Sequence, residues 1–246
     1  MPIAWVHTLP ATFEGRARMM VQNAMAAAAA AHAAGAHLHD IRQGLRSFTT
    51  SIYQAPGRLN VFDLDGVKVL IDYAHNAAGL ETLGDFVERL TTDAPNGGRP
   101  GQASWSANLR VAVVATAGDR RDEDMRQLGR VAARYFDELI IREDRNPRGR
   151  RRGETAALIL EGVREAIASG ARAGNAEIVV DEMEAARKAL DRSRPGDLVV
   201  LCVDHATEVF RELESRRSLA APTIFPSAEG NGQVDGSGGD PDMLGV

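Results

Sequence analysis

Three polar side chains follow directly on a short apolar segment and could bind a ligand: Asp72, His75 and Asn76. The segment before them, residues 67–71, is rich in valine, leucine and isoleucine, which is typical of a strand buried on both faces of an α/β sheet. Open α/β sheets bind ligands beyond the carboxyl ends of their strands, where loops and helix N-termini present donors to phosphates. The pattern is equally compatible with a structural role, in which Asp72 and Asn76 cap a helix that begins near Ala77.

A second polar cluster, residues 118–122, follows a predicted strand at residues 110–115. Gly118 permits a close backbone turn, and Arg120 and Arg121 can each pair with a phosphate or a carboxylate through two hydrogen bonds. Taken alone, this cluster is better explained as a solvated loop whose acidic residues favour the N-terminus of the next helix.

A third cluster, residues 142–154, is a dense run of basic residues after another predicted strand, and Asp204 and His205 follow the last strand. Charge runs are usually solvated surfaces, and a short run is weak support for nucleic-acid binding. The carboxyl ends of parallel strands lie along one edge of a sheet, so separate loops can surround one ligand there. We therefore expect the three clusters and the pair Asp204 and His205 to form one site.

Hydrophobic periodicity predicts an alternation of helices and strands that begins with a β-hairpin at Asp65-Gly66. Such alternation indicates an α/β, Rossmann-like fold, with a largely parallel sheet, right-handed crossovers and helices on both faces. The predicted strands are 58–63, 67–73, 110–115, 138–142, 177–180 and 198–203. The predicted helices of this part are 80–90, 125–135, 154–168, 182–190 and 207–213.

The chain divides into three predicted parts. Residues 1–55 hold two predicted helices, 16–34 and 38–48, with no strand upstream for them to cover, so they look like the last helices of a larger domain. Pro56-Gly57 marks the start of the sheet-containing domain, residues 56–217. Residues 218–246 are rich in glycine and proline, which predicts a disordered tail. Residues 91–108 are rich in Gly, Pro, Asn and Ser and are too many for an ordinary connection, which predicts a mobile surface loop.

The amino-acid composition limits the kinds of function that we expect for this protein. The chain has 246 residues, a formal net charge of -5 and one cysteine, Cys202. We expect no nucleic-acid binding, which needs a basic surface, and one cysteine excludes an internal disulfide. The alanine-rich run 24–34 is too short to span a bilayer, so we expect no membrane segment and a cytoplasmic protein. His32, His37 and His39 lack the accompanying ligands of a metal site, and we predict no metal site built by the protein.

Several motifs together resemble one known family. Asp72-Tyr73-Ala74-His75-Asn76 is preceded by Pro56-Gly57-Arg58 and followed by Gly118-Asp119-Arg120-Arg121-Asp122-Glu123-Asp124. This arrangement is similar to the C-terminal domain of the Mur ligase superfamily. The run from Arg142 to Glu154 makes the chain most like the Mur-like part of cyanophycin synthetases. Phe13-Glu14-Gly15-Arg16-Ala17 and Gln22-Asn23-Ala24 resemble the end of the family's central ATPase domain, to which the two N-terminal helices would then belong.

The resemblance implies an ATP-dependent ligase that joins a carboxylate to an amine through an acyl phosphate; cyanophycin synthetases attach arginine to the aspartate side chains of a polymer. It implies ATP and Mg²⁺ as cofactors and an amino acid or peptide polymer as substrate. The implied ATP-binding residues are Asn23, Arg58, Asp72, His75 and Asn76, with His75 also catalytic. The implied amino-acid-binding residues are Arg120, Asp144, Asn146, Arg148, Asp204 and His205. A carboxylate suits ribose hydroxyls, and arginine and histidine suit phosphate charge.

Two departures from the family pattern bear on function. Ala77 stands where the family has proline, and Arg145 precedes Asn146-Pro147-Arg148 where muramyl ligases have aspartate, which leaves the amino acid substrate open. No G-x-x-x-x-G-K-[ST] motif, the loop that cradles nucleotide phosphates, occurs in the 246 residues. We therefore expect no acyl phosphate formation by this chain alone, and a companion chain that carries the P-loop could complete the site.

Other functions stay open. The same fold could serve as a non-catalytic nucleotide-binding, partner-binding or oligomerising module, and a homo-oligomer is compatible with it. A dehydrogenase is a weaker alternative, because no G-x-G-x-x-G follows the first strand of the sheet. The sequence thus favours the C-terminal portion of an amide ligase, one that is expected to be inactive in isolation.

Overall fold

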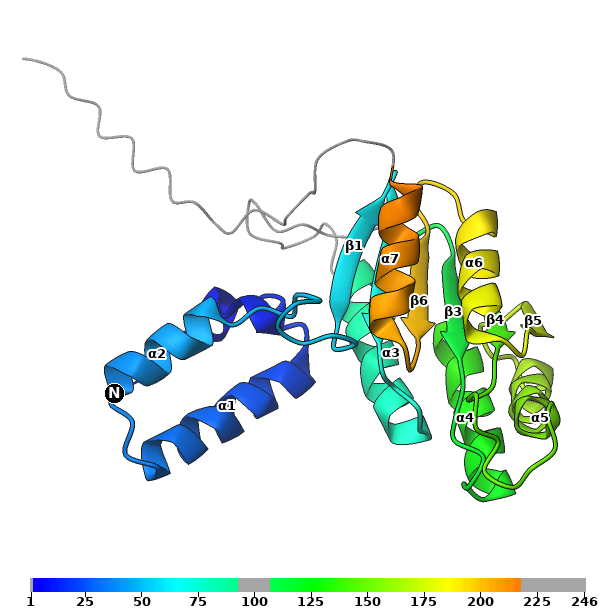
Figure 1. The fold of residues 1–246 in the computed structure, drawn as a ribbon, viewed down its shortest axis with the longest axis horizontal. Helices are drawn as coiled ribbons and strands as arrows, with labels where there is room; N and C mark the ends of the chain where they lie inside the picture. Colours follow the sequence, from blue (N-terminus) through cyan, green and yellow to red (C-terminus); the bar gives the residue numbers. More distant parts are fainter. Residues whose placement is uncertain (1, 93–106, 218–246) are drawn as a thin grey trace, which may run out of the picture.

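A six-stranded sheet organises the molecule in the computed structural model, which describes residues 2–92 and 107–217. The strands are β1 (Asn60–Leu64), β2 (Val67–Asp72), β3 (Arg110–Val114), β4 (Glu138–Ile141), β5 (Asn175–Ile178) and β6 (Leu198–Cys202). Their order is β1-β2-β6-β3-β4-β5; β1 pairs antiparallel with β2, and the other pairs are parallel. The predicted α/β fold, a largely parallel sheet that opens with a hairpin, is confirmed (Figure 1).

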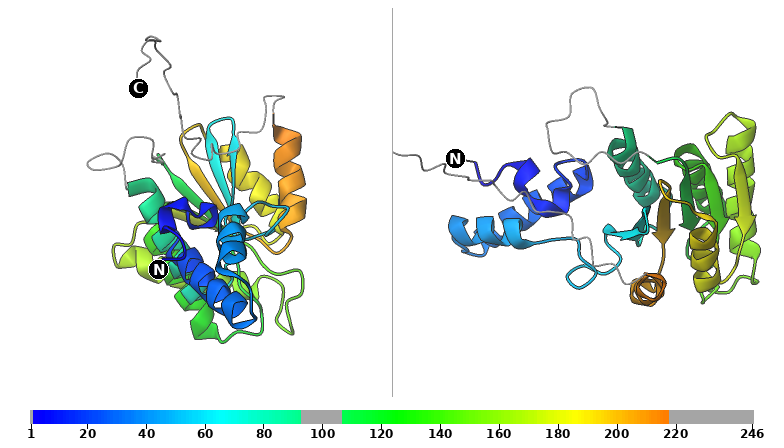
Figure 2. Two further views of the ribbon diagram at one scale, coloured as in Figure 1. Left: turned by 90° about the vertical axis from the view of Figure 1, so that its left-hand side faces the viewer. Right: turned by 90° about the horizontal axis from the view of Figure 1, so that it is seen from above.

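Helices cover both faces of the sheet, as predicted. They are α3 (Ala77–Thr92), α4 (Asp122–Tyr135), α5 (Glu154–Ala168), α6 (Glu182–Arg192) and α7 (Ala206–Arg216). One hydrophobic core lies between the sheet and α3, α4 and α5, and a second lies between the sheet and α6 and α7 (Figure 2). The architecture is therefore a sheet between two helical layers.

Strand β2 illustrates why the apolar run folds in this way. Leu70 packs into the first core, whereas Val69 and Ile71 pack into the second. Successive side chains of a strand point to opposite faces, so a strand covered on both sides needs apolar residues at nearly every position. Because β2, β6, β3 and β4 are neighbouring parallel strands, their carboxyl ends and the loops that follow them lie along one edge of the sheet.

Glycines fix the position of α5, which follows the basic loop. A side-chain carbon added at Gly129 of α4 would lie 2.1 Å from Ile159 O, and one added at Gly162 of α5 would lie 1.9 Å from Arg126 O. Only residues without a side chain allow the two helices to approach so closely. This contact anchors α5 against α4, and with it the end of the loop that runs from β4 to α5.

Two N-terminal helices, α1 (Arg18–Ala33) and α2 (Leu38–Ser47), follow two short 3-10 turns, Val6–Thr8 and Pro10–Thr12. The two helices extend away from the sheet (Figure 1). They are joined to it near the start of α1, where Phe13 packs on Phe86 of α3 with ring centroids 5.1 Å apart and Arg89 donates to Arg16 O at 3.2 Å. Both helices lie where the sequence predicts them, and their assignment to a larger domain stays a prediction.

Most predicted element boundaries lie within three residues of the observed ones. The helix predicted from residue 80 begins at Ala77, directly after the capping residue Asn76. The strand predicted at 177–180 lies two residues earlier, at Asn175–Ile178.

Two predicted features fall outside the part of the chain that the structure describes. These are the tail, residues 218–246, and most of the loop predicted at 91–108, of which Thr91 and Thr92 belong to α3. Of the helices in the described ranges, none combines the length and the apolar character needed to cross a membrane.

Candidate functional site

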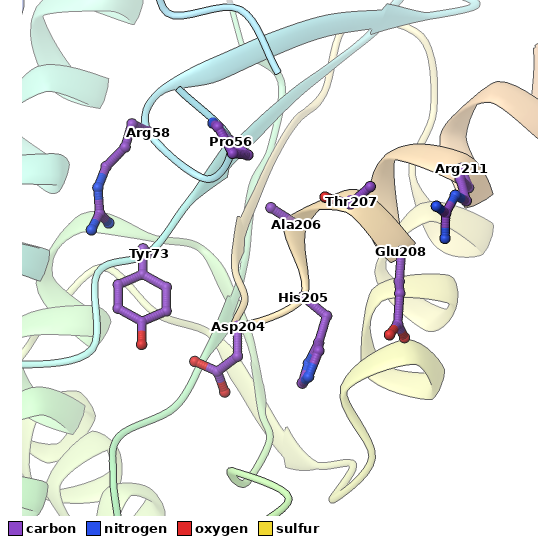
Figure 3. A pocket seen from close by; sticks show the side chains of 9 residues that line it. All are labelled: Pro56, Arg58, Tyr73, Asp204, His205, Ala206, Thr207, Glu208 and Arg211. Atoms are coloured by element: carbon purple, nitrogen blue, oxygen red, sulfur yellow. The ribbon is translucent and has the colours of Figure 1, made fainter. Parts of the chain in front are cut away.

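Two adjoining clefts open beside the carboxyl ends of β2, β3, β4 and β6. The large cleft has a volume of about 520 Å³ and is lined by Pro56, Arg58, Tyr73, Asp204, His205, Ala206, Thr207, Glu208 and Arg211 (Figure 3). The small cleft, about 80 Å³, is lined by Tyr73, His75, Ala115, Thr116, Ala117, Arg120, Arg142, Asp144, Arg148 and Asp204. Tyr73 and Asp204 line both clefts and form the boundary between them.

Asp72 is the last residue of β2, and the backbone engages its carboxylate. Oδ2 accepts a hydrogen bond from Leu59 N at 3.1 Å, and Oδ1 accepts one from Ala74 N at 2.8 Å. Burial raises the pKa of Asp72 above its usual value of 3.8, although the two amides and the nearby Arg58 oppose the rise. The carboxylate therefore ties the exit of β2 to the turn before β1 instead of capping α3.

The cap of α3 is Asn76. Its Oδ1 accepts a hydrogen bond from Gly79 N at 2.8 Å in the first turn of the helix. The capping hypothesis is thus confirmed for Asn76 and wrong for Asp72. Whether either side chain also contacts ATP stays a prediction.

Arg58 reaches the large cleft from a strained turn before β1. The next residue, Leu59, has φ = 50°, a left-handed conformation that non-glycine residues rarely adopt. The buried side-chain amide of Asn60 holds this turn by donating to Thr50 O at 2.6 Å. The Arg58 guanidinium consequently lies over the ring of Tyr73, 4.8 Å from its centroid, as a cation–π contact.

His75 lines the small cleft, with its ring edge-on to Tyr73 at a centroid distance of 5.1 Å. Its Nδ1 lies 3.0 Å from Tyr73 O. A carbonyl oxygen only accepts, so this geometry assigns a proton to Nδ1. Thr116 Oγ1 donates to His75 O at 2.7 Å, which joins the loop after β2 to the loop after β3. The catalytic role of His75 stays a prediction.

Side-chain to backbone hydrogen bonds shape the loop after β4. Asp144 Oδ1 accepts from Asn146 N, and Asn146 Oδ1 accepts from Arg148 N, both at 3.0 Å. The guanidinium of Arg148 donates to Asp119 Oδ2 at 2.8 Å, and this hydrogen bond lowers the pKa of Asp119. Asp144 and Arg148 therefore present their charges to the small cleft, whereas the oxygen of Asn146 maintains the loop.

The loop after β3 is held against the loop after β4 by a close contact and by one arginine. A side-chain carbon at Gly118 would lie 2.1 Å from Pro147 O, so glycine is required there. Arg150 donates to Gly118 O at 2.7 Å and to Arg120 O at 2.9 Å. These contacts position Arg120 at the small cleft, close to the β4 loop.

A buried ion-pair network positions Asp204 and His205. Arg142 and Glu182 are 3% and 2% exposed, and Arg142 Nη2 lies 3.0 Å from Glu182 Oε2. Arg142 Nη1 donates to Asp204 Oδ2 at 2.8 Å, and its Nη2 donates to Cys202 O at 2.9 Å. Glu182 accepts from Asp204 N at 2.8 Å and from His205 N at 3.0 Å. The sequence analysis places Arg142 in the basic cluster 142–154 without naming it as a binding residue, and it misses Glu182.

Glu143 is a further buried residue of the cluster 142–154 to which the sequence analysis assigns no role of its own. Its carboxylate accepts from Gly153 N at 2.8 Å and from Ala156 N at 3.0 Å, which satisfies amides at the start of α5. A signal for Arg142 and Glu143 does exist, because two charged residues stand directly after the apolar strand β4. Glu182, by contrast, resembles an ordinary acidic residue of a first helical turn.

The predicted site residues fall into four groups. The small cleft gathers His75, Arg120, Asp144, Arg148 and Asp204, and the large cleft gathers Arg58, Asp204 and His205. Asp72, Asn76 and Asn146 adjoin the clefts, and their side-chain oxygens bind backbone amides. Asn23 belongs to neither lining; it is exposed on α1, with its Nδ2 3.7 Å from Met20 Sδ.

The large cleft carries guanidinium groups that suit anions beside the carboxylates of Asp204 and Glu208. Arg58 and Arg211 line the large cleft, and guanidinium groups suit phosphate oxygens. Between residues 2 and 92 and between residues 107 and 217, no group of three or more His, Cys, Asp or Glu side chains could hold a metal ion. We therefore assign no Mg²⁺ ligand among the described residues.

Comparison with known proteins gives concordant matches. Residues 57–203 match the family described as Mur ligase, glutamate ligase domain. Cyanophycin synthetase of Crocosphaera subtropica is 40% identical over 211 residues, which cover 86% of this chain and 22% of that protein. The UDP-N-acetylmuramoyl-L-alanyl-D-glutamate–2,6-diaminopimelate ligase of Geobacter metallireducens is 31% identical over 195 residues, 75% of this chain and 34% of that protein.

A solved structure shows the same fold. E. coli FolC in complex with DHPP and ADP aligns with a TM-score of 0.54 and 24% identity over 80% of this chain and 39% of that chain. The chain spans about a fifth of the length of the cyanophycin synthetase it matches. The matched family region contains the whole six-stranded sheet, from β1 to β6. The predicted resemblance is confirmed, and the chain belongs to the Mur ligase, glutamate ligase domain family.

Proposed function

We propose that this chain is the amino-acid-binding part of an ATP-dependent amide ligase of the cyanophycin synthetase type, and that the amino acid it holds is arginine. The observation that carries the proposal is the mixed charge of the small cleft. Three guanidinium groups, two carboxylates and an imidazole line a space of about 80 Å³. A ligand that carries both a carboxylate and an ammonium group is complementary to such a lining.

The charges in the small cleft suggest an orientation for the amino acid. Arg120 and Arg148 come from two different loops and can bind the carboxylate of the ligand. Asp144 and Asp204 have side chains that are 26% and 27% exposed, so each keeps accessible oxygen surface for an ammonium group. The ammonium group then lies at the boundary with the large cleft, because Asp204 lines both clefts.

The large cleft suits the nucleotide. Arg58 and Arg211 provide positive charge for phosphate groups, and Arg58 is held over the ring of Tyr73. His75 lies beside Tyr73 at the edge of the small cleft, close to where phosphate and amino acid would meet. ATP, when bound, supplies the activation of a carboxylate for attack by the amine. In this proposal Asp72 and Asn76 contribute by holding the loop that carries Tyr73 and His75.

The test is a chimera in which this chain replaces the matched part of Crocosphaera subtropica cyanophycin synthetase. We expect ADP release that depends on both arginine and an aspartate polymer, whereas the isolated chain should release none. Arg148→Gln in the chimera should raise KM for arginine about tenfold or more, because it removes a charged contact to the carboxylate.

A matched control is Arg187→Gln, which removes an exposed arginine of α6 that pairs with Glu212. It should leave KM for arginine unchanged. Arginine-dependent ligation with an unaltered KM in Arg148→Gln would overturn the assignment of the small cleft. Arginine- and polymer-dependent ADP release by the isolated chain would overturn the proposed division of labour between this chain and the rest of the ligase.

A further inference from the structure

One buried carboxylate reaches the site from a helix that contributes no residue to either cleft lining. Glu182, in the first turn of α6, is 2% exposed. Its Oε1 accepts from His205 N and lies 3.0 Å from His205 Nδ1, and its Oε2 accepts from Asp204 N. Its contact with Arg142 balances its charge. Glu182 Oε1 contacts both the backbone amide and the ring Nδ1 of His205. These two contacts hold the His205 ring in one orientation.

Two neighbouring side chains each indicate which ring nitrogen of His205 carries the proton. An ionised carboxylate only accepts, so the contact with Glu182 requires a proton on Nδ1. A guanidinium only donates, and Arg145 Nη1 lies 3.5 Å from Nε2, so this contact requires a lone pair on Nε2. Both contacts select the same neutral form of the ring, protonated on Nδ1 and accepting at Nε2. The Arg145 guanidinium also shows where a cationic N–H donor, such as an ammonium group, can contact His205 Nε2.

We propose that His205, oriented by Glu182, takes the proton from the ammonium group of the incoming amino acid; this rests on the proposed function. In this step an N–H bond of the ammonium group breaks, and a new N–H bond forms at His205 Nε2. The bonding pair stays on the amine nitrogen, which becomes the nucleophile. The resulting imidazolium keeps its Nδ1–H bond to the Glu182 carboxylate, and it later returns the proton to water. Glu182 is thus a positioning residue and His205 the base.

The geometry of the large cleft suits this step. Asp204 and His205 project into the cleft next to each other (Figure 3), so an ammonium group held by Asp204 lies within reach of Nε2. Arg145, with a side chain that is 53% exposed and paired with Glu208, can turn towards solvent when the amino acid enters. The charged groups that surround His205 are Glu182 from α6, Arg142 and Arg145 from the loop after β4, and Asp204, Glu208 and Arg211 from its own loop and α7.

The first test uses the chain itself and needs no activity. In a ¹⁵N-histidine NMR spectrum at a pH of about 8, where imidazole is neutral, His205 should show the Nδ1–H form. Glu182→Gln should introduce the Nε2–H form. Glu143→Gln, which removes a buried carboxylate with no contact to His205, should leave the ring unchanged. An Nε2–H form in the unmodified chain would overturn the proposal without any variant.

The second test uses the ligase chimera with two nucleophiles. Arginine needs a base at neutral pH, whereas hydroxylamine is largely unprotonated there and does not. His205→Gln should lower kcat with arginine by about a hundredfold and leave the rate with hydroxylamine nearly unchanged. If the parent chimera uses neither nucleophile, the proposed function fails; if the parent is active and His205→Gln is equally active with arginine, the inference fails.

Discussion

The ends of β2 and β6 use acidic residues in opposite ways. At the end of β2 the carboxylate of Asp72 binds two backbone amides, and the groups that line the clefts are the neighbouring Tyr73 and His75. At the end of β6 the carboxylate of Asp204 lines both clefts, and the backbone amides after the strand bind a different carboxylate, the buried Glu182.

The difference teaches that the carboxylate of an acidic residue at a strand end is available to line a cleft when another residue satisfies the backbone amides there. Buried amides need acceptors, and the nearest carboxylate supplies them unless a second one is available. Glu182 is that second carboxylate at the end of β6, and Arg142 balances its charge. The predictions below test this contrast, beginning with the largest expected effect.

Removing Arg142 should have the largest effect. Arg142→Met leaves the buried Glu182 without its cation, and breaking a buried pair on one side typically lowers the free energy of unfolding by about 3–5 kcal/mol. Urea denaturation measures the loss. Arg187→Met, which breaks an exposed pair with Glu212, should cost only about 0–1 kcal/mol. A loss of similar size in both variants would show that the network under the β6 end does not stabilise the fold.

Removing the carboxylate at the end of β2 should cost less. Asp72→Ala leaves Leu59 N and Ala74 N without their acceptor. Leu59 is buried and Ala74 is only partly buried, so we count one unsatisfied buried donor, which costs about 1–3 kcal/mol. We expect a loss of this size in urea denaturation. Unchanged stability together with weaker nucleotide binding in the ligase chimera would contradict the structural role and favour a direct contact with ATP.

The sequence predicts the fold well because the fold rests on local patterns. The apolar run of β2 and the turn at Asp65-Gly66 each specify their element from neighbouring residues. The alternation of helix and strand indicates a largely parallel sheet, but it does not specify that β6 lies between β2 and β3.

The sequence predicts the site less completely, because burial and partners depend on residues distant in the chain. Asp72 and Asp204 look alike in sequence, yet Asp72 meets the amide of Leu59, which faces it only because Leu59 adopts a left-handed conformation. Glu182 lies among three acidic residues at the start of α6, and only the packing of that helix beside β6 and β4 distinguishes it from Asp181 and Glu184. Residue type and spacing do not contain this information.

Removing the N-terminal cap of α3 should lower the free energy of unfolding by a smaller amount than removing Asp72 does. Asn76→Ala removes the acceptor of Gly79 N, and the loss of such a cap lowers the free energy of unfolding by about 0.5–2 kcal/mol. Thr82→Ala, an exposed change in the same helix, should stay within about 0.5 kcal/mol of the parent. Equal effects of the two variants would show that the helix end is satisfied without Asn76.

The smallest effect concerns the exposed pair of Asp119 and Arg148. Because the hydrogen bond from Arg148 lowers the pKa of Asp119 below its usual 3.8, the folded state binds this proton less tightly than the unfolded state does. The contribution to stability is therefore complete above pH 3.8 and is lost as the pH falls through the lowered pKa. The difference in Tm between the parent and Asp119→Asn should shrink over that range. A difference that grows on acidification would contradict the pairing.

The central claim is that the small cleft binds an amino acid, and an NMR titration of the chain with L-arginine tests it most directly. We predict saturable shifts of the amide signals of Thr116, Ala117 and Asp144, which line the cleft, and loss of these shifts in Arg148→Gln. Shifts confined to α1 and α2, or shifts at the cleft that persist unchanged in Arg148→Gln, would contradict the account.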